Sequence, residues 1–420
     1  MKTSIKKALL IPTVFILASC SNSVGYDRKA YVGYESRETA EHYYNYSDGE
    51  YDPDNGAAPQ AGQLTCAAIN DNLKYDYWKY CLSGDDEQGG GELYSYHRSY
   101  GLYFNTTHRV LLKVENGNDV SIKIKGDTTK YYVDNSGYAF IFAKDYKESY
   151  EATISYLDKD GVRQTIEREI HDNDTIDLEN EFDLSKNLEI MFVVDATGSM
   201  GDEMRYIKAE IDDVIGRVKE ENPESKISLA MMVYRDRNDE YVTRYNDFTE
   251  DIAAQRTWFS NQNAAGGGDI PEAVHTAMNE AVNKQWSTSN TTKLLFHIAD
   301  ASAHDSDVDE WAEAAYKAAD KGIKIISVAA SGTSRMAEYG FRSQSVLTGG
   351  QYVYLTDDSH IGNSHTSAAT EEAPTVEYLN ECMIRLINGY HHGDFKPPVS
   401  IPDPITPDTS SASMEDTSLD

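Results

Sequence analysis

Apolar runs and amphipathic segments alternate through the second half of the chain. Residues 188–195 and 293–300 are mostly apolar up to a final aspartate, which predicts strands covered on both faces. Further strands are predicted at 226–234, 323–332 and 352–355, with an edge strand at 241–248. Apolar residues at helical spacing predict helices at 204–218, 271–286, 308–322, 335–347 and 375–390. This order predicts a doubly wound α/β domain with a mostly parallel sheet over residues 187–392.

Residues 106–170 have a different pattern, in which short strand-like runs such as RVLLKV and YAFIFA are separated by tight turns. The turn sequences are DNSG (134–137) and DKDG (158–161). The pattern predicts a small all-β sandwich, followed by an acidic linker at 171–186. The run YYVDNSGYAFIF resembles an element of carboxypeptidase-regulatory-like and collagen-binding-repeat modules, which implies a spacer.

The two ends of the chain have no regular apolar period. Residues 1–19 combine a basic start with a short apolar core, which predicts a secretory signal peptide. The following Cys20 completes LASC, which resembles a bacterial lipobox and implies a lipid (palmitate) anchor in the cell membrane or outer membrane. The alternative is an ordinary signal peptide with an incidental cysteine. Residues 20–61 are expected to be a flexible acidic, tyrosine-rich tether, and residues 393–420 a disordered tail.

Three further cysteines follow Cys20. In an exported, oxidising setting we expect Cys66 and Cys81 to form a disulfide, which closes a loop of about 15 residues. Residues 62–105 are therefore expected to be a cystine-stapled segment. Cys382 lies in an amphipathic helical pattern, which predicts a buried thiol.

The chain is strongly acidic. Its formal net charge is −32, and removal of residues 1–19 would take away three lysines and no acid, giving −35. Such a surface repels the phosphates of nucleic acid, which excludes nucleic acid as a partner. The expected partner is a protein or another extracellular or periplasmic ligand, and the membrane is contacted through the lipid anchor.

The first buried strand ends in a stretch rich in oxygen atoms. Within DATGSM, Asp195, Thr197 and Ser199 stand at alternate positions at the carboxyl end of the strand, where doubly wound sheets bind ligands. One carboxylate and two hydroxyls that face the same way suit a hard divalent cation such as Mg²⁺. The alternative is a helix cap, in which Thr197 or Ser199 bonds to free N–H groups.

Four motifs in this region follow one another in a recognisable order. DATGSM (195–200) is followed by VYRDRND (233–239), AAGGGDIPEAV (264–274) and LLFHIADASAHD (294–305). Together they resemble a subgroup of von Willebrand factor type A (VWA) domains, which includes those of alpha-type protein kinases and hemicentin-like proteins. The resemblance implies a Rossmann-like VWA fold with a metal-ion-dependent adhesion site (MIDAS) that binds protein ligands.

Applied to this chain, the resemblance implies hydroxyl ligands from Thr197 and Ser199. It implies that Asp195 and Asp300 bind the metal directly or through water. Asp269 stands where integrin-like sites have a threonine, and it is either a further ligand or the cap of the next helix. Three ionised aspartates around a +2 ion would leave the site with one net negative charge, which weakens capture of an acidic partner residue. Mg²⁺ is the expected ion, with Mn²⁺ and Ca²⁺ as alternatives.

Other polar residues near the predicted site have two interpretations each. His304 occupies a histidine position of the subgroup, and we expect it to bond a neighbouring loop rather than a ligand. Arg235 and Asp236 are expected to form an ion pair at the rim, with a ligand contact as the alternative.

No catalytic signature accompanies these residues. Ser199 has no evident paired base, and the sequence contains no G-x-S-x-G elbow, P-loop or kinase glycine-rich loop. We therefore expect a non-enzymatic, lipid-anchored envelope protein that binds a protein or matrix ligand through the MIDAS. The alternatives are a metal-dependent hydrolase or transferase accessory, and a structural envelope protein with an empty metal site.

Overall fold

The computed structural model of the chain describes residues 58–85, 89–180, 186–268, 270–288 and 290–401. From Pro59 onward these residues belong to one compact unit. The predicted signal peptide, Cys20, almost all of the predicted tether, Asp269 and the end of the predicted tail lie outside the described residues. No helix within the described ranges is long and apolar enough to cross a membrane.

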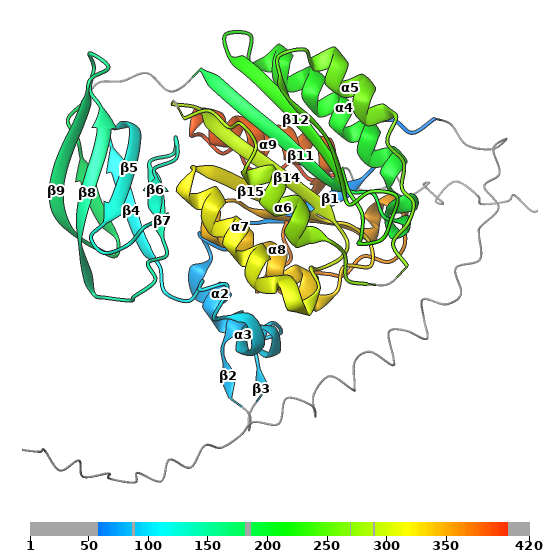
Figure 1. Cartoon of the computed structure of the whole chain (residues 1–420), viewed down its shortest axis with the longest axis horizontal. Helices are drawn as coiled ribbons and strands as arrows, with labels where there is room; N and C mark the ends of the chain where they lie inside the picture. Colours follow the sequence, from blue (N-terminus) through cyan, green and yellow to red (C-terminus); the bar gives the residue numbers. More distant parts are fainter. Residues whose placement is uncertain (1–57, 86–88, 181–185, 269, 289, 402–420) are drawn as a thin grey trace, which may run out of the picture. The chain divides into compact units, whose positions relative to one another are not determined.

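A central sheet of eight strands organises the larger domain (Figure 1). The strands are β1 Thr65–Ile69, β11 Asn187–Asp195, β12 Lys226–Tyr234, β13 Thr243–Thr249, β14 Thr292–Ala299, β15 Ile323–Ala329, β16 Tyr352–Leu355 and β17 Val376–Tyr378. Their order in the sheet is β13-β12-β11-β14-β15-β16-β1-β17. Strands β11, β12, β14, β15 and β16 run parallel, and β13 closes one edge in the antiparallel direction. The mostly parallel sheet and its edge strand are as predicted.

Helices cover both faces of this sheet (Figure 1). They are α4 Met204–Glu221, α5 Ile252–Ser260, α6 Val274–Val282, α7 Val308–Asp320, α8 Arg335–Thr348 and α9 Leu379–His392. Successive side chains of a strand point to opposite faces, so the apolar residues of β11 divide between two cores. Phe192 and Val194 pack in the core with α4, α5 and α9, whereas Met191 and Val193 pack with α6, α7 and α8. This confirms the doubly wound fold.

Two smaller sheets occupy the region predicted as a β-sandwich. Their strands are β4 Val110–Glu115, β5 Asn118–Ile124, β6 Lys130–Tyr132, β7 Tyr138–Ile141, β8 Ser149–Leu157, β9 Arg163–His171 and β10 Asp174–Asp177. They pair in the orders β10-β4-β7 and β6-β5-β8-β9 around a core of their own. Strand β10 pairs in parallel with β4, so the sandwich continues into the stretch 171–186 that was expected to be a linker.

The segment 62–105 belongs to the larger domain, which corrects the predicted boundary. Strand β1 pairs antiparallel with β16 on one side and with β17 on the other. The pair β2 Gly84–Asp85 and β3 Gly89–Gly90 and the helices α2 Tyr75–Leu82 and α3 Tyr94–Tyr100 follow it. Just before β1, the buried carboxylate of Glu210 accepts hydrogen bonds from the N–H groups of Gly62, Gln63 and Leu64 at 2.7 to 2.9 Å. The sandwich is therefore inserted between two strands of one sheet.

The predicted disulfide between Cys66 and Cys81 is wrong, because all three described cysteines are free and buried. Cys66 lies on β1 and faces the core under α4 and α9, where Cys382 is its neighbour. Cys81 lies on α2 and packs into the core on the opposite face of the sheet. The sheet separates the two thiols, and their short spacing along the chain does not reveal this.

A buried ion pair joins the N-terminal segment to α8. The fully buried Arg342 guanidinium binds both carboxylate oxygens of Asp71, at 2.9 and 2.6 Å, and one oxygen of Glu338, at 2.9 Å. It also donates to the carbonyl of Ala369 at 2.8 Å, and it lies 5.1 Å from the ring of Trp78. One cation therefore links β1's flanking segment, α8 and the loop that precedes β17.

We expect Asp71→Asn to lower the free energy of unfolding by about 3 kcal/mol, because it removes a charge partner from a buried cation. Urea unfolding followed by circular dichroism measures the change. Asp76→Asn is the matched control, since the Asp76 carboxylate is exposed on α2 and pairs only with Lys79, and its stability should match the parent. Equal unfolding curves for Asp71→Asn and the parent would contradict the role given to this ion pair.

Candidate metal-binding site

Two aspartates meet at the carboxyl edge of the central sheet. Asp195 is the last residue of β11, and Asp300 directly follows β14. The two strands are parallel neighbours, with Val194 opposite Ile298, so both aspartates leave the sheet at the same edge. Asp195 is 0% exposed and Asp300 is 9% exposed. The register of two parallel strands thus brings together carboxyl groups that are far apart in the sequence.

Hydrogen bonds order the loop that follows β11. Asp195 Oδ1 accepts from the N–H of Thr197 at 2.9 Å and from its hydroxyl at 2.7 Å, and the hydroxyls of Thr197 and Ser199 are 3.1 Å apart. The short 3₁₀ helix Gly198–Gly201 and α4 both begin in the described residues without a side-chain hydrogen bond at the N-cap. The hydroxyls therefore gather around Asp195 and do not act as helix caps.

One oxygen of each aspartate, Asp195 Oδ2 and Asp300 Oδ1, is buried and accepts no hydrogen bond from the residues that the structure describes. Burial raises the pKa of Asp195 to about 6, and burial together with the charge of Asp195 raises the pKa of Asp300 to about 8. The hydroxyl of Ser199 offsets part of the rise in the pKa of Asp300. Burying a charged carboxylate oxygen that has no hydrogen-bond donor costs free energy, and a cation next to that oxygen would lower this cost. These residues fit a divalent cation.

Glu272 is a third buried carboxyl group at this edge, and the sequence interpretation gave it no role. It is 2% exposed, its Oε2 accepts no hydrogen bond in the described structure, and burial with the charges of Asp195 and Asp236 raises its pKa to about 9. Its N–H donates to the carbonyl of Ser302 at 3.0 Å, which holds the loop after β14 beside it. The sequence feature that could have pointed to Glu272 is its position three residues after Asp269 in the motif GGGDIPE.

The glycine loop packs directly on the loop that follows β11. Residues 266–268, all glycine, have φ angles of 79°, 77° and 132°, which residues with a side chain rarely adopt. The Gly198 N–H donates to the carbonyl of the first glycine at 3.1 Å. A Cβ on the second glycine would lie 3.4 Å from Cβ of Thr197 and 3.1 Å from Oε1 of Glu272. The glycines thus allow the loop to cross next to Thr197. Asp269 comes next, outside the described residues, and its role stays a prediction.

The rim residues hold loops together. His304 Nε2 lies 2.8 Å from Asp236 Oδ1, so it bonds a neighbouring loop as expected. Arg235 is not paired with Asp236 in the described part of the chain, which corrects the predicted ion pair. Its guanidinium donates instead to the carbonyls of Ala196 and Asn263 at 3.0 and 2.9 Å. These bonds fix the loop after β11 and the glycine loop to the end of β12.

The side chain of His365, in the loop after β16, is buried and contacts the start of α4 at this edge of the sheet. His365 Nε2 is 2.6 Å from an oxygen of Glu203, at the start of α4, and Nδ1 is 2.8 Å from Asp357. Burial alone would lower the pKa of His365, but the hydrogen bonds to the two carboxylates raise it above its ordinary value. Glu203 also adds to the rise in the pKa of Asp300. The loop after β16 is thereby tied beside the aspartates, which the sequence did not indicate.

Carboxylates alone do not complete a metal site here. Within the described residues, which omit Asp269, no three His, Cys, Asp or Glu side chains form a group that could hold a metal ion. A cation at this edge would therefore need the hydroxyls of Thr197 and Ser199 in addition to Asp195 and Asp300. The set predicted from the sequence contains these four residues together with Asp269, which lies outside the described residues.

Comparison with known families identifies the larger domain. Residues 189–358 match the von Willebrand factor A domain family. This region is a VWA domain. The matched residues include the buried aspartates, the glycine loop and most of the central sheet, whereas β1 and the sandwich precede them.

Two curated proteins resemble part of the chain. Alpha-protein kinase vwkA of Dictyostelium discoideum is 24% identical over 213 residues, which are 47% of this chain and 32% of the kinase. An ariadne-like RING finger protein of Acanthamoeba polyphaga mimivirus is 30% identical over 117 residues, which are 28% of this chain and 11% of that protein. The chain thus spans at most about a third of the length of these relatives.

Solved structures of low similarity were also found. BatB from Bacteroides thetaiotaomicron is 16% identical, with a TM-score of 0.32, over 42% of this chain and 91% of that chain. The pilus adhesin SpaC from Lactobacillus rhamnosus GG, in an open conformation, is 11% identical, with a TM-score of 0.34, over 66% of this chain and 34% of the adhesin. Similarity at this level carries no argument about the function of the VWA domain.

Proposed function

We propose that the VWA domain binds a protein or matrix ligand through a divalent cation. The cation would be held by Asp195, Thr197, Ser199 and Asp300, with Asp269 as a further ligand. The observation that carries the proposal is the pair of buried aspartate oxygens, Asp195 Oδ2 and Asp300 Oδ1, for which the described part of the chain provides no hydrogen-bond donor. Mg²⁺ suits carboxylate and hydroxyl oxygens and keeps coordination positions for water or for an oxygen of the partner.

The charge at the site bears on the chemistry of the partner. Ionised Asp195 and Asp300 would neutralise a +2 ion, and Asp269 would make the site negative. The site therefore favours a neutral oxygen of the partner, such as an amide carbonyl or a hydroxyl, over an acidic side chain.

We also infer that the protein is lipid-anchored in a bacterial envelope through Cys20. The support is the order of a basic start, an apolar core and LASC in the first 20 residues. An anchor would hold the VWA domain at the membrane surface, where its partner would be another envelope or matrix component.

Calorimetric titration of Mg²⁺ into the purified protein is expected to show one saturable site, with Mn²⁺ and Ca²⁺ titrated in parallel. Asp195→Ala should abolish binding, and Thr197→Val should weaken it about tenfold or more, because a ligand hydroxyl is lost while the shape is kept. Asp309→Ala is the control, since this carboxylate is exposed in the first turn of α7. Unchanged affinity in Asp195→Ala would remove the metal assignment.

Partner capture should depend on the metal. Immobilised protein is expected to retain a partner from an envelope or matrix extract in Mg²⁺ and to release it in EDTA, because the cation bridges the two surfaces. Asp195→Ala should capture nothing, whereas Asp309→Ala should behave like the parent. Capture that is insensitive to both EDTA and Asp195→Ala would contradict the proposal. Turnover of ester or phosphoester substrates that needs the metal and Asp269 would favour the hydrolase alternative.

The anchor is tested by detergent partitioning of the protein expressed in a bacterial host. The parent is expected to enter the detergent phase and to incorporate labelled palmitate, because a processed Cys20 carries acyl chains. Cys20→Ala should stay in the aqueous phase, and Ser23→Ala should partition like the parent. A Cys20→Ala protein that still carries the label would rule the anchor out.

A further inference from the structure

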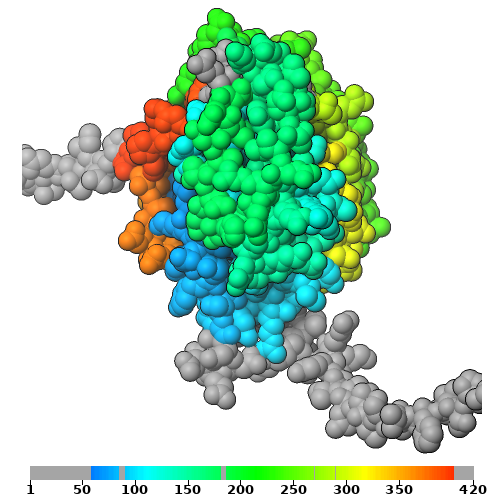
Figure 2. All heavy atoms as spheres, turned by 90° about the vertical axis from the view of Figure 1, so that its left-hand side faces the viewer, coloured from blue at the N-terminus to red at the C-terminus, as the bar shows by residue number. Residues whose placement is uncertain are grey.

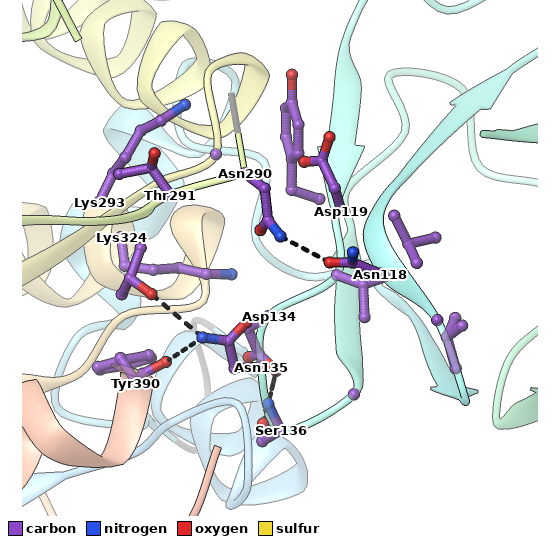
Figure 3. A pocket seen from close by; sticks show the side chains of 18 of the residues that line it. Asn118, Asp119, Asp134, Asn135, Ser136, Asn290, Thr291, Lys293, Lys324 and Tyr390 are labelled. Carbon is purple, nitrogen blue, oxygen red and sulfur yellow. Dashed lines mark hydrogen bonds between the residues drawn. The ribbon is translucent and has the colours of Figure 1, made fainter. Parts of the chain in front are cut away.

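A cavity of about 440 Å³ lies where the sandwich meets the amino edge of the central sheet. The sandwich contributes Asn118 and Asn135, and the VWA domain contributes residues at the amino ends of β14 and β15. Figure 2 looks onto the sandwich, which covers this edge, and Figure 3 shows the side chains that line the cavity. Asp300 follows the opposite, carboxyl end of β14, and Asp195 ends the neighbouring parallel strand β11, so the proposed metal-dependent function does not use this cavity.

Lys324 brings an unpaired positive charge to the cavity. Its side chain is 8% exposed and extends into the cavity (Figure 3). In the described part of the chain its ammonium group forms no hydrogen bond or ion pair. It lies 5.8 Å from the centre of the Phe140 ring and next to Gly349, where an added Cβ would come within 2.9 Å of it, and Asp134 attracts its charge. Burial lowers the pKa of Lys324, as expected for an ammonium group without a close partner.

The acidic groups that line the cavity are already engaged. Asp134 Oδ1 accepts hydrogen bonds from the N–H and hydroxyl of Ser136 and from the N–H of Tyr138, at 2.6 to 3.1 Å. The two other carboxylates form ion pairs within the sandwich: Glu115 with Lys113, and Asp119 with Arg163. Asp134 thus attracts Lys324 from a distance, but within the described residues no acid of the lining forms an ion pair with it.

A second buried lysine lies close by. Lys293, at the start of β14, is 7% exposed, and its ammonium group donates to the carbonyl of Lys321 at 2.8 Å. Burial lowers its pKa as well. The register pairs Lys293 with Ile323 and Lys324 with Leu294, so the two lysine side chains leave the sheet on opposite faces and point apart in Figure 3. Lys293 therefore has its own hydrogen-bond partner, and Lys324 is the cation that an anion in the cavity would pair with.

Hydrogen bonds between the sandwich and the VWA domain fix the walls of the cavity. The side-chain amide of Asn135 donates to the Thr292 hydroxyl at 3.1 Å and to the Tyr390 carbonyl at 3.2 Å, and Asn290 donates to Asn118 at 2.6 Å (Figure 3). These three bonds join side chains of the sandwich to the sheet edge or to α9. The cavity is thus formed before any ligand binds, which is typical of small-molecule sites.

We propose that this cavity binds a small anion with a carboxylate or phosphate group, which pairs with Lys324. An anion would supply the charge partner that the protein does not give to Lys324. Charge-assisted hydrogen bonds from a buried ammonium group to such an anion are among the stronger polar interactions in proteins. The site goes beyond the proposed function and does not depend on a metal.

The test uses the full chain with sodium phosphate and, separately, sodium succinate, each compared with sodium chloride at equal ionic strength. Calorimetry is expected to show saturable binding of at least one anion, and the melting temperature should rise with its concentration. The anion that binds more tightly identifies a phosphate or a carboxylate ligand. Lys324→Met keeps the apolar stem and removes the charge, so it should weaken binding about tenfold or more.

Lys123→Met is the matched control, because Lys123 is exposed on β5 outside the cavity lining, and its anion affinity should equal that of the parent. Lys324→Gln, which keeps a polar end without the charge, is the second variant if Lys324→Met does not fold, and it should weaken binding by a similar factor. A parent that binds neither anion overturns the proposal. So does a folded Lys324→Met protein, or a Lys324→Gln protein in its place, that binds as tightly as the parent.

Discussion

The crowding of buried carboxyl groups at one edge of the sheet is the constraint around which the VWA domain is arranged. The parallel register of β11 and β14 places Asp195 beside Asp300, and Glu272, just before α6, is bonded to the loop after β14. The charge of Asp195 raises the pKa of both Asp300 and Glu272, and burial raises the pKa of all three groups, so the edge favours a cation. Thr197 offsets part of the rise in the pKa of Asp195 with two hydrogen bonds to its carboxylate. The helices that begin here also present the positive ends of their dipoles to the carboxyl groups.

The placement of the two aspartates could be predicted from the sequence, because the apolar pattern locates the strand ends and the parallel topology puts those ends at one edge of the sheet. A strand buried on both faces has an almost continuous apolar run, so the ends of β11 and β14 could be located from the first polar residue, Asp195 or Asp300. The rule that parallel strands carry their ligands at the carboxyl edge then brings the two aspartates together without any further information. The glycine run 266–268 was visible as well, since three successive glycines indicate positive φ angles and a close approach of backbones.

The features that were not predicted from the sequence mostly depend on contacts between distant parts of the chain. Strand β1 is five residues long and comes before the sandwich, and nothing in TCAAI indicates pairing with β16 and β17. The incorrect Cys66–Cys81 disulfide has the same origin, because chain spacing says nothing about which face of a sheet a thiol occupies. Helix α5 was missed because it is short and starts within a polar stretch, where Asp251 caps it. Glu272 was overlooked because its burial comes from packing of the loop after β14.

The place of β1 changes the role that the sequence implied for the sandwich. A module that precedes the VWA domain in the sequence would be a spacer between an N-terminal anchor and that domain. Here the chain first enters the central sheet through β1, held by Glu210 just before it and by β16 and β17 on either side, and only then forms the sandwich. A tether ending at residue 61 would therefore pull on the sheet directly. The sandwich lies off that path, and its contacts with the amino edge of the sheet, among them Asn135 with Tyr390, serve to enclose the cavity around Lys324.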